Sequence, residues 1–385
     1  MSEFRTIREL CSVVADCPHS TPKWTANGKI VIRNNNIKHG RIDLSSPSYT
    51  DEEHFAQRIK RAKPQSGDII ITREAPIGDV GMIPENTECC LGQRMVLLRA
   101  DQSVCDNFYL LYSLQSLYVQ HQISWSEGTG TTVSNLRIPH LEQIRIPYLP
   151  LEQQTKISSV LRALEEKIEN NRRLNDNLQQ QAMALYAEMF LNSSNNDVTS
   201  GTLSDIAAIT MGQSPSGSSY NENGVGEVFY QGRAEFGFRY PKRRLFTTEP
   251  KRMAEAGDVL LSVRAPVGDL NVAYERCCIG RGLGAIHSKT GHSSFVLYTM
   301  FALRSQLDVF NGEGTVFGSI NRDALNAIPI AIPLLTRIDR FEAVAHPIDK
   351  LIRTNYEENC RLEAIRDSLL PKLMSGEIDV SAVQL

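Results

Sequence analysis

The chain has 385 residues, of which 41% are hydrophobic and 22% charged, and its formal net charge is −3. This length exceeds the roughly 250 to 300 residues at which a single hydrophobic core stops growing, so we expect two globular units. The small net charge excludes a protein that coats polyanions with its whole surface, and no apolar run approaches the ~20 residues that cross a bilayer. At the start of the chain, MSEFRTIREL lacks the charged-then-apolar layout of a secretory signal, which predicts a cytoplasmic location.

An internal repeat runs through the sequence. Residues 67–79 read GDIIITREAPIGD and residues 257–269 read GDVLLSVRAPVGD, with six of thirteen positions identical. Further matches follow in the same order along the chain: residues 6–13 with 202–209, 89–92 with 277–280, 111–112 with 297–298, and 128–130 with 312–314. The repeat predicts a duplicated core, with each copy taking about half of the chain.

Each copy has the pattern of an α+β unit. Short β-rich runs at 69–72 and 259–263 lead into Ala-Pro-x-Gly-Asp turns, and one helix is expected near 108–123 or 295–310. We interpret the glycine-rich stretch from Gly280 as structural, because its third glycine comes too early for a dinucleotide loop. The GTGTT run from Gly128 is expected to be a mobile polar turn.

The cysteines predict buried thiols. There are eight, without a C-x-x-C pair, and neighbouring side chains on a strand point to opposite faces, which suits neither a shared metal nor a relaxed disulfide. The histidines also lack a helical metal-binding spacing, so no metal site is expected.

Two long helices are predicted from a heptad pattern, one between the copies and one at the end of the second copy. Adding 184 to the positions of the first seam gives the second, and Asn171 and Asn175 interrupt the first where Asn355 and Asn359 interrupt the second. The expected helix–helix interface residues are Ile157, Leu161, Leu164, Ile168, Leu178, Leu185, Phe341, Ile348, Ile352, Leu362 and Leu369.

These seams allow two arrangements. A lone amphipathic helix usually packs on its own domain, whereas matched polar interruptions favour two helices that pair antiparallel, with buried Asn residues fixing the register. At 1.5 Å per residue, the stretch from Ile157 to Met189 would span about 50 Å, longer than the ~34 Å of one duplex turn. The paired helices would then act as a spacer.

Basic residues gather at equivalent places in the two copies. Residues 231–252 hold seven Lys and Arg residues against two Glu residues, and the first copy has basic and Asn-rich stretches at 33–41 and 58–63. Arg and Asn match guanine and adenine edges in pairs, and Lys and Arg neutralise phosphates. A solvated surface is the alternative. The candidate DNA-binding residues are Arg33, Asn34, Asn35, Lys38, Arg41, Arg233, Arg239, Lys242, Arg243 and Arg244.

Catalytic motifs of the common classes are missing from the sequence. There is no phosphate loop, no nucleophile elbow and no Asn/Asp-Pro-Pro-aromatic run of the kind that holds an amino group for methyl transfer. Two other hypotheses stay open. A self-contained DNA methyltransferase would bind S-adenosylmethionine by itself, and a scaffold would use its helices to join proteins without reading DNA.

The chain resembles the specificity (S) subunit of Type I restriction-modification enzymes over essentially its whole length. The resemblance is carried by residues 146–171, IPYLPLEQQTKISSVLRALEEKIENN, and 358–380, ENCRLEAIRDSLLPKLMSGEIDV. Where the first helix opens with Pro-Leu-Glu-Gln-Gln at 150–154, the second opens with Pro-Leu-Leu-Thr-Arg at 333–337, which departs from the family pattern.

This resemblance implies a non-catalytic DNA-recognition subunit of the α+β class, with two pseudo-repeated target-recognition domains joined by two long helices that form an antiparallel coiled coil. We expect target-recognition domain 1 at 1–150, a central helix at 151–192, a linker at 193–201, target-recognition domain 2 at 202–335 and a C-terminal helix at 336–385. The linker is predicted from the polar and glycine content of residues 192–201, which fits a solvated joint.

The resemblance also implies partners. The chain would bind a bipartite DNA target and two modification subunits, which use S-adenosylmethionine to methylate adenine N6. Restriction subunits that need ATP and Mg would join the complex and cleave unmodified DNA. No cofactor is expected on this chain itself.

Overall fold

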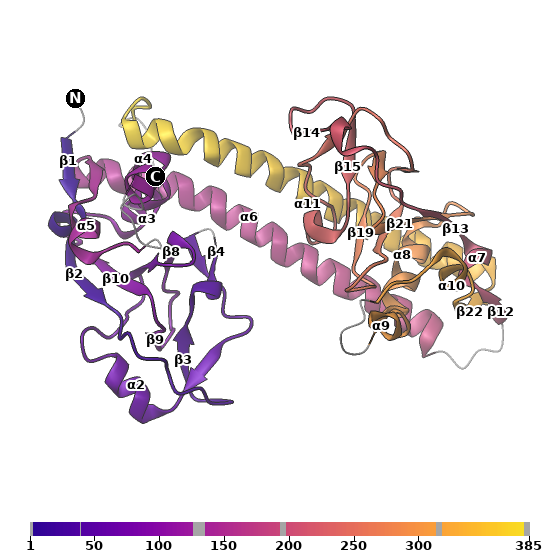
Figure 1. The fold of residues 1–385 in the computed structure, drawn as a ribbon, viewed down its shortest axis with the longest axis horizontal. Helices are drawn as coiled ribbons and strands as arrows, with labels where there is room; N and C mark the ends of the chain where they lie inside the picture. The colour runs from indigo at the N-terminus through magenta and orange to yellow at the C-terminus, as the bar shows by residue number, and fades with distance from the viewer. Residues whose placement is uncertain (1–2, 39, 126–134, 193–197, 313–317, 381–385) are drawn as a thin grey trace. The chain divides into compact units, whose positions relative to one another are not determined.

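The computed structural model describes residues 3–38, 40–125, 135–192, 198–312 and 318–380, which fold into two compact units (Figure 1). Unit 1 comprises Met1–Asn170 with Glu358–Leu385, and unit 2 comprises Asn171–Glu357. The long helices α6 (Leu151–Tyr186) and α11 (Leu335–Ser375) each contribute one segment to each unit. The GTGTT run from Gly128 lies outside the described residues. None of the helices in the described ranges is long and apolar enough to span a membrane.

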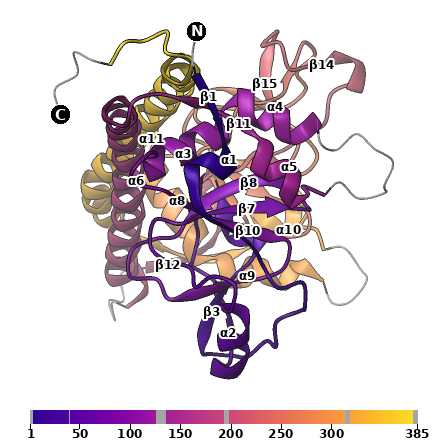
Figure 2. The ribbon, with the colours of Figure 1, turned by 90° about the vertical axis from the view of Figure 1, so that its left-hand side faces the viewer.

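Unit 1 is built on a mixed sheet with the order β2-β10-β7-β8-β5-β4. Figure 2 shows its neighbouring strands β10, β7 and β8. A three-stranded sheet, β6-β3-β9, and a pair, β1-β11, complete its strands. The strands are β1 (Glu3–Thr6), β2 (Cys11–Asp16), β3 (Lys29–Ile32), β4 (Ile37–Lys38), β5 (Gly40–Ile42), β6 (Ser48–Thr50), β7 (Ile69–Arg73), β8 (Ile77–Met82), β9 (Cys89–Leu91), β10 (Met95–Ala100) and β11 (Arg145–Tyr148). Its shorter helices are α1 (Ile7–Leu10), α2 (Glu52–Arg58), α3 (Asn107–Gln115), α4 (Leu117–Trp125) and α5 (Ile138–Gln143).

Strand β7 explains why the repeated run is apolar at every position. Ile69 and Ile71 face a core formed with α1, α3 and α4, whereas Ile70 faces a second core formed with β3 and β9. Because successive side chains of a strand alternate between faces, a strand covered on both sides must be apolar throughout.

Unit 2 repeats this plan around a sheet with the order β13-β21-β18-β19, beside a second sheet, β14-β16-β15-β20-β17, and a pair, β12-β22. The strands are β12 (Val198–Thr202), β13 (Ala207–Met211), β14 (Tyr220–Asn221), β15 (Glu227–Tyr230), β16 (Phe246–Thr247), β17 (Met253–Ala254), β18 (Val259–Ser262), β19 (Leu270–Val272), β20 (Cys277–Ile279), β21 (Leu283–Ser288) and β22 (Pro329–Pro333). The shorter helices are α7 (Leu203–Ile206), α8 (Ser293–Ala302), α9 (Arg304–Asp308) and α10 (Arg322–Asn326).

The predicted duplication is confirmed at the level of strand register. In unit 1, β3 pairs in parallel with β9 and places Val31 opposite Cys90. In unit 2, β15 pairs in parallel with β20 and places Phe229 opposite Cys278. Residues 29–32 and 227–230 are therefore equivalent with an offset of 198, and the mixture of sheets and helices confirms the α+β class.

The single helix expected after the core strands is broken in both units. Ser116 separates α3 from α4 with an extended backbone, and its hydroxyl donates to the Ser113 carbonyl oxygen at 2.6 Å. In unit 2, Leu303 separates α8 from α9. The hydroxyl gives the backbone a local alternative to continuing the helix, which an apolar pattern does not reveal.

Residues 198–201, the last four residues of the expected linker, belong to a strand. Val198–Thr202 forms strand β12, which pairs antiparallel with β22 and places Ser200 opposite Ala331. The composition of this stretch predicted a solvated joint, but its backbone pairs with the distant strand β22, so residues 198–201 form part of a two-stranded sheet. The same pairing joins β1 to β11 in unit 1.

The adjacent cysteines are buried thiols, as predicted. Cys89 packs in the core beside β7, while Cys90 packs on the opposite side of β9 against Phe55. Burial raises the pKa of Cys89 to about 12 and that of Cys277 to about 12, so both remain protonated thiols. Cys360 differs from the expectation because it is exposed on α11.

The two long helices contact each other inside each unit and also complete its core. In unit 1, Ile157 and Leu161 of α6 share a core with Leu373 of α11 and with α3. In unit 2, Tyr186 of α6 packs against Phe341 of α11 with ring centroids 5.6 Å apart. Both arrangements considered from the sequence therefore occur together, and a coiled coil continuous through both units stays a prediction.

The remaining predicted seam residues are largely protected from solvent. Ile168 and Ile352 are buried, Leu185 and Ile348 pack on the core of unit 2, and Leu369 packs on the core of unit 1. The other three, Leu164, Leu178 and Leu362, are half-buried.

The interrupting asparagines are buried and join the helices by hydrogen bonds. In unit 2, the Asn355 Nδ2 donates to Asn175 Oδ1 at 2.8 Å, and the Asn175 Nδ2 donates to the Ile352 carbonyl oxygen at 3.3 Å. In unit 1, the Asn359 Nδ2 donates to the Ile168 carbonyl oxygen at 3.3 Å. In unit 1 the numbering rises along one helix as it falls along the other, with Glu165 near Arg366 and Ile168 near Asn359, so the segments run antiparallel.

Candidate nucleic-acid interface

Residues 33–41, here named the first basic segment, leave strand β3 through a single 3-10 turn, Asn34–Asn36. The buried Asn36 holds this turn, because its Oδ1 accepts from the Arg33 backbone N–H at 2.9 Å and its Nδ2 donates to the Asp43 carbonyl oxygen at 2.9 Å. The Asn34 Nδ2 donates to the Glu74 carbonyl oxygen at 2.8 Å, which ties the turn to the repeated Ala-Pro turn. The turn Asn34–Asn36 is thus held by hydrogen bonds on both sides.

Three of the predicted DNA-binding side chains in this segment are exposed: Arg33, Asn35 and Lys38. The Arg33 guanidinium lies 5.2 Å from the ring centroid of Trp24, whose side chain is 46% exposed. Lys38 pairs with Asp43 at 2.7 Å. Exposed ion pairs and cation–π contacts of this kind contribute little to stability, so the cations can exchange these partners for phosphate oxygens.

Asn34 and Arg41 are held by the protein more firmly. Asn34 is half-buried and its amide nitrogen is used internally, as described above. The Arg41 Nη2 donates to the Glu165 carbonyl oxygen on α6 at 3.0 Å, and its Nη1 pairs with Glu169 at 3.0 Å. Arg41 therefore points at a helix of its own unit.

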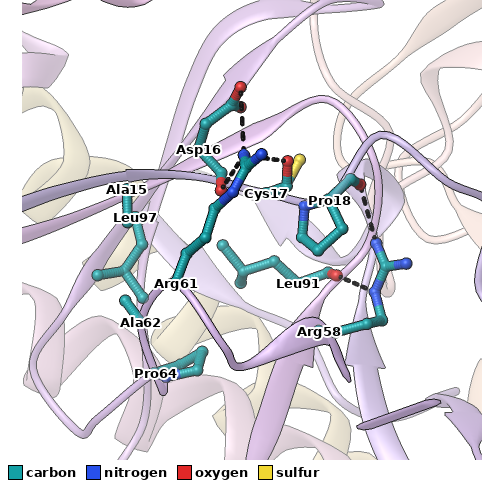
Figure 3. Close-up of a pocket in the computed structure, with 10 residues that line it drawn as sticks. All are labelled: Ala15, Asp16, Cys17, Pro18, Arg58, Arg61, Ala62, Pro64, Leu91 and Leu97. Carbon is teal, nitrogen blue, oxygen red and sulfur yellow. Dashed lines mark hydrogen bonds and ion pairs between the residues drawn. The ribbon is translucent and has the colours of Figure 1, made fainter. Parts of the chain in front are cut away.

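The second basic stretch of unit 1 is partly internal. Arg58 is buried, and its guanidinium donates to the carbonyl oxygens of Leu91 and Pro18 (Figure 3). It also donates to the Ser20 carbonyl oxygen. Arg61 donates to the Asp16 carbonyl oxygen at 3.2 Å. Burial lowers the pKa of Arg58. The cavity between them has a volume of about 10 Å³, enough for no more than one water molecule.

Residues 233–244, here named the second basic segment, begin at the 3-10 turn Arg233–Glu235 after strand β15. Arg233 is exposed and pairs with Asp269, which also pairs with Arg304 at 2.9 Å. Asp269 therefore keeps a cationic partner if Arg233 turns to a ligand. Asp269 belongs to the repeated Gly-Asp turn, so the core motif supports the segment.

The cations at the end of the second basic segment are also exposed. Lys242 has no ion-pair partner within the ranges that the structure describes. Arg243 pairs with Glu275, and Arg244 pairs with Glu235 at 2.6 Å. Because Glu235 is buried, Arg244 also has a structural role, whereas Lys242 has the greatest freedom to meet a phosphate.

Arg239, a candidate DNA-binding residue in the sequence, lies in the interior of unit 2. Its side chain is 3% exposed and pairs with Asp349 of α11 at 2.9 Å. Its Nη2 also donates to Gln179 Oε1 of α6 at 2.9 Å. Burial opposes the charged form of Arg239, but Asp349 and Tyr298 outweigh it, so the net pKa is raised. We therefore remove Arg239 from the proposed DNA-contacting set.

Sequence reasoning missed Trp24 and the helix carboxylates that hold Arg41 and Arg239. An exposed aromatic near a basic segment is a signal that could have found Trp24. The internal repeat could have found the carboxylates, since the offset of 184 between the helices pairs Glu165 with Asp349. In the part of the chain that the structure describes, no group of three His, Cys, Asp or Glu side chains could hold a metal ion.

Comparison with known proteins identifies the repeated units. The family model described as Type I restriction modification DNA specificity domain matches residues 2–180 and again 195–364. Two relatives from Methanocaldococcus jannaschii are the MjaX and MjaIX specificity subunits of type I restriction enzymes. The first is 28% identical over 98% of this chain and 94% of its own length, and the second is 23% identical over 95% and 87%.

A solved structure shares the fold. The S subunit of the Type I restriction-modification system from M. genitalium is 18% identical, covers 97% of this chain and 96% of its own, and has a TM-score of 0.59. Because the family model matches both repeats and together spans most of the sequence, the chain belongs to the type I restriction-modification DNA specificity subunits, non-catalytic proteins that recognise DNA sequence.

Proposed function

We propose that this subunit reads a bipartite DNA target, with each unit recognising one half-site through its basic segment. The support is the repeat itself: two cores with the same strand register present basic segments at equivalent places, but the exposed residues differ. The strand offset of 198 makes Asn35 equivalent to Arg233. Amide and guanidinium groups match different base edges, so equivalent positions would read different bases.

The proposed contacts divide by chemistry. Arg33 and Asn35 in unit 1 and Arg233 and Arg243 in unit 2 have planar groups that can bind base edges in pairs. Lys38 and Lys242 carry compact ammonium groups, which suit phosphates. Asn34 and Arg244 would support the segments and contact DNA only with their remaining atoms.

The helices would set the unread spacer between the half-sites. Support comes from the helix contacts inside each unit, where buried asparagines fix the register of α6 and α11. A protein held in register by buried polar pairs has a defined length, which a spacer requires.

Chemistry would belong to partner subunits. Two modification subunits with S-adenosylmethionine would methylate adenine N6, and restriction subunits with ATP and Mg would cleave unmodified DNA. Because a base inside a duplex is inaccessible, the modification subunits would flip out the target adenine while this subunit holds the flanking sequence. The complex would act in the cytoplasm, where the host DNA lies.

Long-read sequencing of modified bases in the host tests this proposal. We expect one methylated motif made of two defined half-sites separated by a fixed number of unread bases, and its loss when the gene for this chain is deleted. A motif that persists after deletion, or a single continuous motif, would contradict the proposal. Calorimetry with S-adenosylmethionine supplies a control, since binding to the isolated chain would favour a self-contained methyltransferase.

A further inference from the structure

A cluster of three side chains joins the first basic segment to helix α6 in unit 1. The Arg41 guanidinium lies 4.0 Å from Glu165 Oε2 and donates to the Glu165 carbonyl oxygen at 3.0 Å. The Tyr112 hydroxyl of α3 donates to Glu165 Oε2 at 3.1 Å. Tyr112 is buried, and burial raises its pKa, so the hydroxyl stays protonated and able to donate. Glu165 thus interacts with the first basic segment through its carbonyl oxygen and its carboxylate, and with α3 through the carboxylate.

Unit 2 contains the same cluster. The Arg239 Nη1 pairs with Asp349 Oδ1 of α11 at 2.9 Å, and the Tyr298 hydroxyl of α8 donates to the same oxygen at 2.9 Å. The Arg239 Nη2 lies 3.4 Å from the Tyr298 hydroxyl oxygen, which closes the triangle. Here too, burial raises the pKa of the tyrosine and keeps its proton in place.

The two clusters are equivalent by three separate offsets. Arg41 and Arg239 differ by 198, as the flanking strands β3 and β15 do. The tyrosines differ by 186, as the repeated Leu-Tyr pairs do, and the acidic residues differ by 184, as the helix seams do. The offsets differ because insertions and deletions lie between the three residues in the sequence. In both units, however, the arginine and the tyrosine interact with the same acidic position of a long helix.

The backbone around the arginines is matched as well. Arg41 lies opposite Met82 in the pairing of β5 with β8, and the Arg239 carbonyl oxygen accepts from the Val272 N–H at 2.8 Å. Met82 and Val272 are themselves equivalent, because each lies opposite the first residue of its central strand, Ile69 or Val259. The backbones of Arg41 and Arg239 therefore lie beside equivalent residues of the two units.

Both clusters reach the second long helix of their unit. In unit 1, Arg366 of α11 lies 3.9 Å from Glu165 of α6. In unit 2, Gln179 of α6 accepts from Arg239, while Asp349 belongs to α11. The Arg239 side chain is 3% exposed, whereas the Arg41 side chain is 40% exposed and is held by Glu165 and Glu169 together. A guanidinium that donates to several fixed acceptors has a defined geometry, unlike an exposed ion pair with one partner. A basic segment attached in this way has one orientation relative to both helix segments of its unit.

We propose that these clusters, named the helix clamps (Arg41–Glu165–Tyr112 and Arg239–Asp349–Tyr298), are positioning residues that determine how accurately each unit reads its half-site. The inference rests on the proposed function. The clamps do not touch DNA; they fix the angle at which the exposed residues of each basic segment meet the groove. An angular error weakens base contacts more than phosphate contacts, because base contacts require tighter geometry.

The test uses mild substitutions in the full chain, expressed in its host with the partner subunits. Tyr112→Phe and Tyr298→Phe remove one donor to each clamp, and Arg41→Lys and Arg239→Lys keep the charge but lose the planar fork. We expect the unit 1 variants to methylate sites with a mismatch in one half-site several-fold more often, and the unit 2 variants to do so at the other half-site. Spacer length should not change.

Matched controls come from the neighbours of the tyrosines. Leu111→Val and Leu297→Val occupy equivalent buried positions on α3 and α8 and weaken the core without touching a clamp. They should lower the amount of methylation and leave the base preference at both half-sites as in the wild type. A purely structural role for the clamps would give the same result for the tyrosine variants.

Relaxed base preference confined to one half-site per variant would support the helix clamps. Unaltered preference in all four clamp variants, or relaxation of both half-sites by a change in one unit, would overturn the inference. If an arginine variant fails to assemble, the tyrosine variant of the same clamp decides. Absence of a two-part motif in the wild type would instead count against the proposed function itself.

Discussion

Basic side chains of this protein divide into two kinds according to what surrounds the charged group. Lys242 is exposed with no described ion pair, whereas Arg239, three positions earlier, is buried against Asp349. In the sequence both belong to one basic run. The difference comes from packing: Tyr240 and Pro241 between them are buried, which turns Arg239 inward and leaves Lys242 at the surface.

This contrast predicts stability losses of very different size for two substitutions. Arg239→Ala should lower the free energy of unfolding of unit 2 by about 3 to 5 kcal/mol, because it leaves Asp349 largely buried without its cation. Lys242→Ala should change it by less than about 0.5 kcal/mol. Scanning calorimetry of the full chain checks both, and equal shifts in the unfolding temperature would contradict the division.

Lys242 has little effect on stability but is expected to contribute to DNA affinity. Lys242→Ala should reduce the slope of log affinity against log salt by about one unit if the ammonium group meets a phosphate. Fluorescence anisotropy across a salt series measures this slope. Lys251→Ala, another exposed cation of the basic run but outside the second basic segment, serves as the control and should leave the slope unchanged.

At the scale of elements, the buried asparagines show how the long helices combine stability with register. Asn175 and Asn355 donate and accept across the helix pair of unit 2 and are both buried. Buried asparagines lower the stability of a helix pair relative to leucine, but their hydrogen bonds can form in only one register of the two helices. The matched spacing in the sequence was enough to predict their burial, because heptad positions determine which side faces the partner helix.

Asn355→Ala should destabilise unit 2 by about 1 to 3 kcal/mol, since Asn175 Oδ1 loses its buried donor. Replacing both residues by leucine should recover most or all of this loss, because no polar atom is then left unpaired. Thermal unfolding of the two variants beside the wild type tests the order. A double variant less stable than the single variant would show that the pair contributes more than register.

Helix boundaries were less predictable than helix existence. The break at Ser116 depends on a hydroxyl that bonds to the Ser113 carbonyl oxygen, and strand β12 depends on pairing with β22 more than a hundred residues away. The break does not change the apolar pattern that predicted one helix, and the pairing of β12 does not change the polar composition that predicted a linker. The local sequence pattern therefore predicted that these helices and strands exist, whereas the residues at which they end depended on individual hydrogen bonds.

At the scale of the whole molecule, the proposed spacer makes a quantitative prediction. Inserting four residues within residues 163–170 of α6 lengthens the helix by about 6 Å, close to two base-pair steps of ~3.4 Å. A second variant carries a matched insertion within residues 359–366 of α11, which faces this part of α6 in unit 1. Base-modification sequencing should show unchanged half-sites with a longer gap. An active variant with the original gap would contradict the role of the helices.

Patterns in the amino-acid sequence were sufficient to predict the duplication, the α+β class and the two long helices. Each follows from a pattern that a core imposes on neighbouring residues: apolar strands covered on both faces, glycine turns and heptad seams. The resemblance at residues 146–171 and 358–380 also led to the family that the comparison then showed.

Which basic residues are available to a ligand depends on how the chain folds and could not be read from the sequence. Arg41 meets Glu165 across 124 residues of sequence, and Arg239 meets Asp349 across 110. Composition cannot distinguish these arginines from their exposed neighbours, because the free energy of a charge depends on burial and on partners that the chain brings together only when it folds.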